Sequence, residues 1–355
     1  MSFKVHNHAI GTGTSCTPIL RSALKKSLPY SVNLTYRTQH PNRSPDAQIL
    51  ATFLPHAEEI PNCWAAAYID RSQRPETELW IFARGEIPGH FANSGDGQQF
   101  CPTCKKAVLS LLGHLSTLPV PPIHPDNLNT LEIAKQHEKE FPEKGPNARY
   151  PVSLASYYRH LLDPNSVVTL GACHEQLVQI CTDAGLVRQE FPGHQARLDK
   201  FIFNVADLPS KKDLPQGLRW GEMTKEAIDI MQATATIPRT TSTLLTMERV
   251  GVFDEKTGLP IAWAFLGLDG SLVSLYTDQA YRGKGVAKAV AGRIFSEFVP
   301  GLAVDQAGNA WAHADVYEGN IQSASVCQSL GGVATWKEYW VRIDITRAGG
   351  LSQTE

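Results

Sequence analysis

The sequence predicts an α/β protein of two domains, in which a mixed sheet is flanked by helices. Three observations support this. Runs of strand-forming residues alternate with amphipathic helical runs along the chain. The pattern restarts after residues 207–217, a charged stretch with two prolines, which predicts domains over 1–206 and 207–355. Finally, a strand-like run over 272–277 leads through a glycine-rich turn directly into a helix that begins near Val286.

The composition is that of a globular protein with an ample core. The chain has 355 residues, of which 42% are hydrophobic and 19% charged, and its net charge is −2. This charge argues against nucleic acid as the main partner, and no apolar run approaches the roughly 20 residues that a membrane span needs. The seven cysteines are scattered and odd in number, which favours reduced thiols and a cytoplasmic protein.

The amino-terminal segment carries an unusual charge bias. No Asp or Glu precedes Asp46, whereas six Lys and Arg residues do. Such a bias is typical of an organelle transit peptide, so a mitochondrial location is the alternative to the cytoplasm. We favour a folded segment instead, with a short helix from Ile19 followed by a strand over 31–36.

The first half alternates strands and helices. The residue patterns predict strands over 63–69, 78–83 and 167–171, two strands around Gly193 within 187–204, a loop over 85–97, and helices over 101–118, 128–141, 153–162 and 174–183.

The second half repeats this alternation. The patterns predict strands over 218–222, 247–253, 261–268, 272–277, 310–316, 333–335 and 339–345, with helices over 224–233, 240–246, 286–298 and 321–330 and a disordered tail over 346–355. Both halves close with a helix, a glycine and a strand, which suggests a duplicated architecture.

The glycine-rich turn Arg282-Gly283-Lys284-Gly285 is suited to binding a pyrophosphate. The first amides of the following helix lack intrahelical partners and lie at the positive end of its dipole. Gly283 and Gly285 place no side chain in the way of an anion, and Arg282 and Lys284 add positive charge that also suits a 3′-phosphate. No Ser or Thr follows Lys284, and position 288 is Lys, so the motifs of nucleotide hydrolases and dinucleotide-binding proteins do not fit.

The turn, continued by Val286 and Ala287, has the pattern R-x-x-G-x-A directly after a strand, which resembles the coenzyme A signature of the GNAT superfamily of N-acyltransferases. Within that superfamily the chain looks most similar to glycine N-acyltransferase-like proteins. Four segments carry this resemblance: residues 20–36; Gly258-Leu259-Pro260-Ile261-Ala262-Trp263; Tyr276-Thr277 with Tyr281-Arg282; and His313-Ala314-Asp315 with Asn320, Trp336 and Trp340.

The resemblance implies a GNAT fold, with a mostly antiparallel sheet that splays open and a degenerate first copy in the amino-terminal half. It also implies an acetyl-CoA or other acyl-CoA co-substrate whose pantetheine arm lies between the fourth and fifth strands. The main chain of Leu275, Tyr276 and Thr277 would then bind that arm, and one of these amides would stabilise the oxyanion. Asn320 and Ser323 would contact the arm from the next helix, although either residue is also an ordinary helix cap.

The catalytic residues are less clear from the resemblance. The family's proposed base is a Glu at the start of the fourth strand, where this chain has Ser271. His313 and Asp315 lie at i and i+2 on the fifth strand, so their side chains share a face, and we predict Asp315, alone or with His313, as the base. Cys327 stands where many relatives have a tyrosine acid, and is a candidate for protonating the CoA thiolate.

No metal is expected. Cys101-x-x-Cys104 is a single CxxC pair without a second pair at zinc-finger spacing, and it favours a helix start that carries two thiols over a zinc site.

The predicted function is transfer of an acyl group from acyl-CoA to the amine of a small molecule or amino acid, by direct attack in a ternary complex. The alternatives are a non-catalytic protein that binds or senses CoA, and an acetyltransferase acting on a protein amino terminus or lysine. Ser271 and Cys327, in place of the usual Glu and Tyr, motivate the first alternative.

Overall fold

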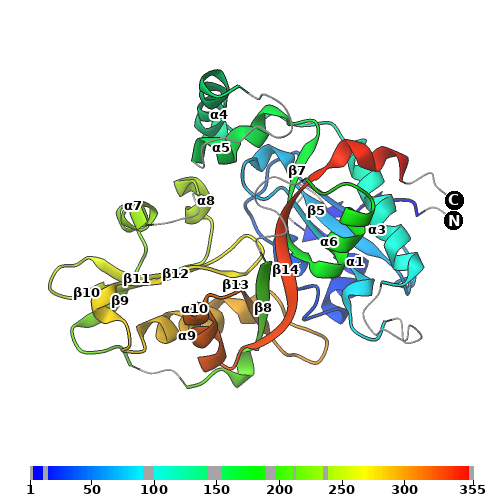
Figure 1. Cartoon of the computed structure of the whole chain (residues 1–355). Coiled ribbons are helices and arrows are strands. Elements are labelled where there is room, and N and C mark those ends of the chain that lie inside the picture. Colours follow the sequence, from blue (N-terminus) through cyan, green and yellow to red (C-terminus); the bar gives the residue numbers. More distant parts are fainter. Residues whose placement is uncertain are drawn as a thin grey trace. The chain divides into compact units, whose positions relative to one another are not determined.

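The computed structural model describes residues 3–10, 15–90, 100–142, 154–188, 197–210, 213–234 and 239–351. It forms two compact units, each assembled from separate stretches of the chain (Figure 1). Unit 1 comprises Met1–Leu20, Arg43–Ala196 and Tyr339–Glu355, and unit 2 comprises Arg21–Asn42 and Arg197–Glu338. The division of domains at 206/207 remains a prediction.

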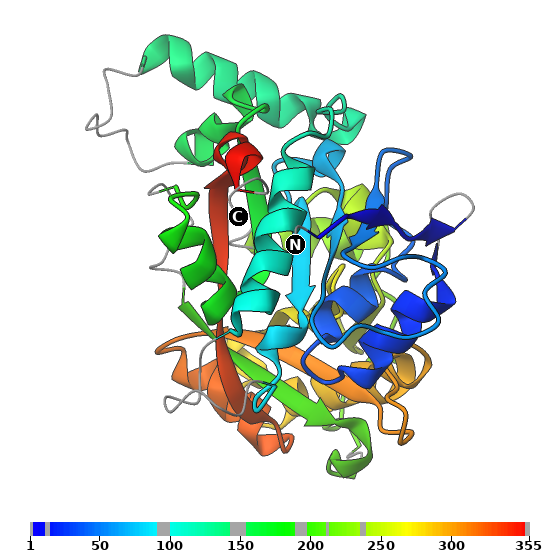
Figure 2. The ribbon, with the colours of Figure 1, turned by 90° about the vertical axis from the view of Figure 1, so that its right-hand side faces the viewer.

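Unit 1 is built around a sheet whose strands follow the order β1-β4-β5-β6-β7-β14. These strands are β1 (His6–Asn7), β4 (Gln48–Ala51), β5 (Ala65–Ile69), β6 (Leu79–Ala83), β7 (Val167–His174) and the carboxyl-terminal part of β14 (Val333–Asp344). A small hairpin joins β2 (Ala9–Ile10) and β3 (Ser15–Cys16). The helices are α3 (Pro102–Leu115), α4 (Leu128–Glu140), α5 (Leu154–Tyr158) and α6 (Glu175–Asp183). Helix α3 lies against the strands of the sheet (Figure 2) and buries its apolar face in the core of unit 1.

Unit 2 contains two groups of strands. One is an antiparallel sheet of order β12-β11-β10-β9, and the other sets β8 between β13 and the first part of β14. The strands are β8 (Arg197–Asn204), β9 (Leu218–Gly221), β10 (Arg249–Asp254), β11 (Pro260–Leu266), β12 (Leu272–Thr277) and β13 (Trp311–Tyr317). The helices are α2 (Val32–Arg37), α7 (Lys225–Thr234), α8 (Thr241–Leu245), α9 (Val286–Phe298) and α10 (Ile321–Ser329); α1 (Pro18–Lys26) begins in unit 1 and continues into unit 2. Helix α9 packs on the β10–β12 face through Val290, Ile294 and Phe295 (Figure 1).

The two units share a topology. In unit 1, β4, β5 and β6 are antiparallel neighbours, α3 follows, and β7 then pairs with β6 in parallel at Leu79 and Leu170. In unit 2, β10, β11 and β12 are antiparallel, α9 follows, and β13 meets β12 in parallel. The predicted duplication of a mixed, mostly antiparallel fold is confirmed.

Most predicted elements are present within a few residues of their expected bounds, and three expectations are wrong. Residues 32–37 form helix α2 rather than a strand. All six are buried, so the alternation of apolar and polar residues, from which a half-exposed strand was predicted, does not reflect alternating exposure. Strands 333–335 and 339–345 are one strand, β14, because Glu338 is buried against a lysine and does not interrupt it. Residues 345–350 form a 3₁₀ helix that buries Ile345 and Ala348, so this part of the tail is ordered.

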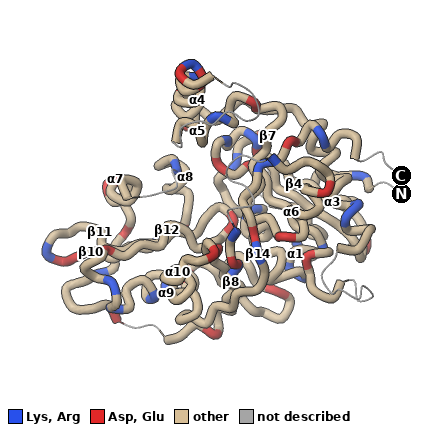
Figure 3. The backbone as a smooth tube through the Cα atoms, in the orientation of Figure 1, with Lys and Arg blue, Asp and Glu red and all other residues tan. Residues whose placement is uncertain are grey.

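Two expectations fall partly outside the described residues. The predicted loop over 85–97 extends beyond residue 90, and the strand expected before Gly193 is seen only as an isolated bridge between Val187 and Ile343. Acidic and basic residues are interspersed along the described parts of both units (Figure 3). No helix in the described ranges has the length and apolarity to cross a bilayer.

Candidate active site

The glycine turn has the geometry expected of an anion cradle. Gly283 and Gly285 have φ values of 75° and 81°, in the left-handed region that favours glycine. A Cβ atom built at either position would meet nothing within 4 Å, so the backbone conformation, and not lack of space, requires glycine here. Gly285 is the N-cap of α9, and residues 282–285 are exposed. The first amides of α9 are therefore accessible to an anion.

Side chains around the turn fix its position beside β12. The Arg282 Nε donates a hydrogen bond to the Thr277 carbonyl at 3.0 Å. The Tyr281 hydroxyl donates to Asp254 Oδ2 at 2.7 Å, and the Lys284 ammonium lies 5.2 Å from the centre of the Tyr281 ring. Val286, the first residue of α9, is buried and anchors the helix start in the core. The turn thus joins the end of β12 rigidly to the start of α9.

Strands β12 and β13 touch and then separate. An isolated parallel bridge joins Ser271 to His313, yet the two strands belong to different sheets in the described structure. Because β12 is an edge strand paired with β11 on its other side, the edge of β12 that faces β13 offers main-chain groups outside any ladder. Such an edge can pair with an extended ligand as an added strand.

A bulge distorts β12 within this edge. The register with β11 shifts so that Ser274 and Leu275 face a single residue, and Ser274 has a φ of 54°. Positive φ is uncommon for a residue with a side chain, and bulges re-aim backbone groups next to active sites. The stretch 275–277, predicted to bind the pantetheine arm, thus begins at an irregular point of an edge strand. The Tyr276 ring stacks on Trp263 with 4.5 Å between ring centres.

The predicted catalytic pair lies in a buried network of charges. Lys200 of β8 has its Nζ 2.6 Å from Asp315 Oδ1 and 2.9 Å from Glu338 Oε2. The same ammonium donates to His313 Nδ1 at 3.0 Å. The four side chains are at most 4% exposed. A lysine at this depth is stable only when it is paired, so the network is a structural requirement of unit 2.

The hydrogen bonds of His313 fix its tautomer. An ammonium only donates, so His313 Nδ1 accepts from Lys200, and the other nitrogen, Nε2, donates to the Asp269 carbonyl at 2.9 Å. The imidazole is therefore neutral, and its lone pair is occupied. His313 is in consequence poorly placed to take a proton, and instead ties β13 to the turn before β12.

The carboxyl groups of Asp315 and Glu338 both contact Lys200, yet their pKa values are shifted in opposite directions. Burial alone would raise the pKa of Asp315, but the Lys200 ammonium outweighs it and holds that pKa well below its usual range. Burial raises the pKa of Glu338 to about 8, although Lys200 acts in the opposite direction. At neutral pH, Asp315 is thus the anion of the network. Its Oδ2 is buried and has no hydrogen-bond partner among the described residues.

Ser271, which stands at the family's Glu position, supports Asp269. Its Oγ donates to Asp269 Oδ1 at 2.6 Å, and the Asn33 amide of α2 donates to Oδ2 at 2.9 Å. Ser271 and Asp269 are buried. Together with the hydrogen bond from His313 to the Asp269 carbonyl, these contacts fix the point beyond which β12 and β13 separate.

The remaining predicted residues lie on α10. Asn320 caps this helix, since its side chain accepts a hydrogen bond from the Ser323 amide at 3.1 Å. Cys327 is buried, and burial, followed by the charge of Asp315, raises its pKa to about 12. An ordinary thiol titrates near 8.5, so proton transfer from Cys327 to a CoA thiolate would be unfavourable.

Lys200, Glu338, Asp269 and Asn33 belong to the network and were not predicted. One sequence signal does point to Lys200: it lies at i+2 and i−2 from Leu198 and Ile202, on the buried face of β8. A lysine on the apolar face of a strand must have a partner. The identity of that partner follows only from the fold, because β8 precedes β13 by more than a hundred residues.

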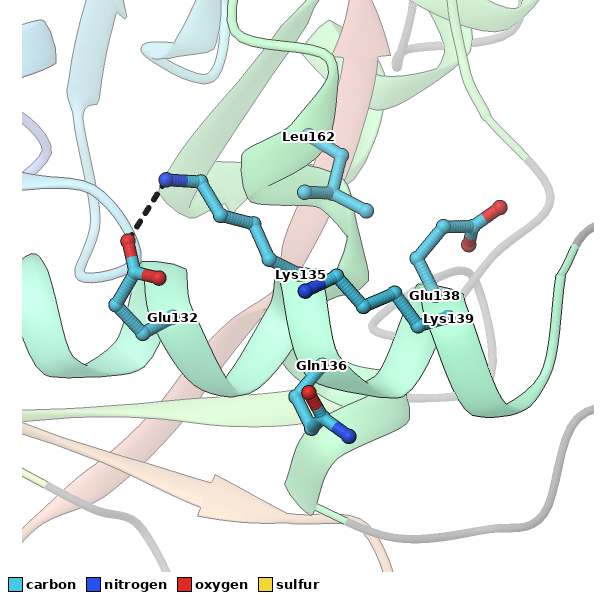
Figure 4. A pocket seen from close by; sticks show the side chains of 6 residues that line it. All are labelled: Glu132, Lys135, Gln136, Glu138, Lys139 and Leu162. Atoms are coloured by element: carbon cyan, nitrogen blue, oxygen red, sulfur yellow. Dashed lines mark hydrogen bonds and ion pairs between the residues drawn. The ribbon is translucent and has the colours of Figure 1, made fainter.

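A surface pocket in unit 1 is unrelated to this site. It runs along α4 and is lined by Leu162 and by charged and polar side chains of α4. Among these, Glu132 and Lys135 form an ion pair at 2.7 Å (Figure 4). Its lining is that of a solvated helix face.

Two family models match the chain. The model described as the acyl-CoA N-acyltransferase verG N-terminal domain matches residues 3–203, more than half of the sequence. The model described as FR47-like protein matches residues 249–341, which include the glycine turn and β13. Among curated proteins, none matched the sequence.

Several solved structures are similar to the chain. A Drosophila protein from a structural genomics consortium has a TM-score of 0.52 and 11% identity, over 92% of this chain and 95% of its own. A tandem GNAT protein from the clavulanic acid biosynthesis pathway has a TM-score of 0.44 and 9% identity, over 96% and 98%. A GCN5-related N-acetyltransferase from Sphaerobacter thermophilus has a TM-score of 0.41 and 10% identity, over 96% of each chain. The first of these likenesses shows the fold, and the first family model, which covers more than half of the sequence, shows the family. The chain belongs to the acyl-CoA N-acyltransferase (GNAT) family.

Proposed function

We propose that unit 2 transfers an acyl group from acyl-CoA to the amine of a small molecule or amino acid, by direct attack in a ternary complex. The observation that carries this proposal is the junction of an edge strand, β12, with an exposed glycine turn at the start of α9. The turn would hold the pyrophosphate, and Arg282 and Lys284 supply charge for the phosphates. The arm of the co-substrate would pair with 275–277 as an added strand.

This arrangement supplies what acyl transfer from a thioester needs. An amide of 275–277 would donate to the oxyanion of the tetrahedral intermediate, whose stabilisation is commonly the largest catalytic contribution. The amine and the thioester would be held in attack geometry between β12 and β13. The amide bond forms as the carbon–sulfur bond breaks, and CoA leaves as the thiolate.

We propose that Asp315 acts on the acceptor amine. It is the anion of the buried network, and its Oδ2 has no hydrogen-bond partner among the described residues. The negative charge of Asp315 would attract and orient the acceptor ammonium. Because a carboxylate stabilises the charged form of an amine, the proton that the amine loses before it attacks would pass to solvent. His313 is a positioning residue in this proposal, because its lone pair is taken by Lys200. Cys327 has no assigned role.

A second candidate function is binding or sensing of CoA without catalysis. Two observations favour it: the buried Ser271 hydroxyl donates its hydrogen bond to Asp269, and burial raises the pKa of Cys327 to about 12. Neither residue can then replace the base and acid that relatives use.

Release of free thiol from acetyl-CoA and benzoyl-CoA, measured against a panel of small amines and amino acids, separates the two functions. The proposal predicts thiol release that depends on both the acyl-CoA and one class of amine. Tight binding of acyl-CoA without thiol release across the panel would favour the sensor.

A further inference from the structure

We propose that unit 1 holds a structural zinc ion through Cys63, Cys101, Cys104 and His90. The ligand atoms of these four residues all lie within 4.8 Å of one another. Three thiols and one imidazole are a donor set that zinc prefers, and four protein ligands are typical of a structural site. The inference is independent of the proposed acyl transfer, because all four residues belong to unit 1.

Three of the distances between ligand atoms match the edges of a tetrahedral zinc site. The Cys63 Sγ lies 3.5 Å from His90 Nε2 and 3.5 Å from Cys101 Sγ, and the Cys104 Sγ lies 3.4 Å from His90 Nε2. Ligands at zinc–sulfur and zinc–nitrogen bond lengths of about 2.3 and 2.0 Å are separated by roughly 3.5–3.8 Å along the edges of a tetrahedron. Thiols are weak hydrogen-bond donors, so hydrogen bonding alone gives little reason to gather three of them around one imidazole.

Groups around the cluster suit bound thiolates. Cys101 is the N-cap of α3, and its Sγ accepts a hydrogen bond from the Cys104 amide at 3.3 Å. The Arg84 guanidinium acts electrostatically on both Cys63 and His90. Three thiolates, a neutral imidazole and Zn²⁺ carry a net charge of −1, which the helix amide and Arg84 complement.

Two residues of the cluster lie in the connection of unit 1 that corresponds to the glycine turn of unit 2. In unit 2 the exposed turn connects β12 to α9, and in unit 1 the equivalent connection, from β6 to α3, contains His90 and Cys101. The helix start that faces an anion in one copy would face metal-bound thiolates in the other. Cys63, which precedes β5, completes the site and links three separate segments of unit 1. A metal would thus tie these segments together and stabilise the fold of unit 1.

The test uses the full chain, purified under reducing conditions in metal-free buffers, and measures metal content by mass spectrometry. We expect one zinc ion per chain that remains through gel filtration. Replacement of zinc by Co²⁺ should give the absorption of a tetrahedral site together with intense thiolate-to-metal charge-transfer bands. The Cys104→Ser and His90→Asn variants should lose most of the metal, whereas Cys173→Ser, at a buried cysteine elsewhere in unit 1, should retain it.

If the variants do not fold, the Co²⁺ spectrum of the unmodified chain still tests whether the four residues bind a metal. Folded, reduced protein that contains no zinc and takes up no Co²⁺ would overturn the proposal. So would full zinc retention in both cluster variants, or a Cys63–Cys101 disulfide in the protein isolated without reductant and without metal.

Discussion

Lys200 determines what the polar residues of β13 can do. Its ammonium occupies the lone pair of His313 and holds Asp315 as an anion, so a pair that shares a strand face has two different roles. The sequence shows that His313 and Asp315 lie on one face, but not that a cation from β8 lies between them. The assignment of Asp315 to the acceptor amine is therefore testable through its pH dependence.

Asp315→Asn should reduce turnover at neutral pH by about 10- to 100-fold, the effect of losing about 1.5–3 kcal/mol of interaction with the acceptor ammonium. The loss should shrink at high pH, where the acceptor is free amine and carries no charge for Asp315 to attract. The measurement is a profile of kcat/KM against pH for the acceptor, with stability recorded in parallel. Asp199→Asn is the matched control, because Asp199 pairs with Lys337 at the surface of the neighbouring strand β8. An unchanged rate in Asp315→Asn would remove Asp315 from the mechanism.

Glu338 should make the stability of the protein depend on pH. Its pKa is raised to about 8 in the folded state from an ordinary value of 4.5. A raised pKa contributes stability that is fully present below pH 4.5 and is lost as the pH rises through 8. Between pH 6 and pH 9, this loss should be on the order of 2 kcal/mol.

Glu338→Gln keeps the neutral form at every pH, so its free energy of unfolding should vary less over that window than that of the unmodified chain. Denaturant titrations at several pH values measure the difference. A Glu338→Gln variant with the full pH dependence of the unmodified chain would show that another group is responsible.

At the scale of elements, strand β8 is required for the core of unit 2. It pairs with β13 along seven residue pairs, from Trp311↔Asn204 to Tyr317↔Leu198, and it supplies Lys200. Helix α2, from the start of the chain, supplies Asn33 to Asp269. Both elements precede residue 207, so the second half of the sequence lacks parts of its own core.

A fragment of residues 207–355 should therefore fail to fold alone. Without Lys200, the carboxyl groups of Asp315 and Glu338 would be buried without their cation, at a cost of about 3–5 kcal/mol, and β13 would lose its partner strand. Far-ultraviolet circular dichroism, gel filtration and cooperative unfolding provide the measurement, with the full chain as control. A folded fragment that binds CoA would contradict this expectation.

The elements also show how far the sequence can be interpreted. The turn and helix around Gly285 were predictable because glycine, charge and helical spacing are local signals. Helix α2 was not, since its apolar and polar residues alternate although all six are buried. The continuity of β14 was not, since a buried Glu338 resembles a strand end. The network of Lys200 and the meeting of Cys63 with His90 depend on contacts between distant segments. Such contacts follow from topology, which a single sequence specifies only through a recognised fold.

At the scale of the whole molecule, two copies of one topology have diverged in the connection between their third antiparallel strand and the following helix. In unit 2 this connection is an exposed glycine turn that suits the phosphates of a co-substrate. In unit 1 it carries thiols and an imidazole that suit a metal. We assign binding of acyl-CoA to unit 2, and to the first turn of α9 in particular.

Calorimetric titration with CoA of the unmodified chain, Gly285→Asp and Gly258→Asp tests this claim most directly. Gly258 has a φ of 69° and, like Gly285, open space at its Cβ, so both variants carry a similar backbone strain. We expect the unmodified chain and Gly258→Asp to bind CoA equally, whereas Gly285→Asp, with a carboxylate in the cradle, should show no binding. CoA affinity in folded Gly285→Asp equal to that of the unmodified chain would contradict the assignment of the site.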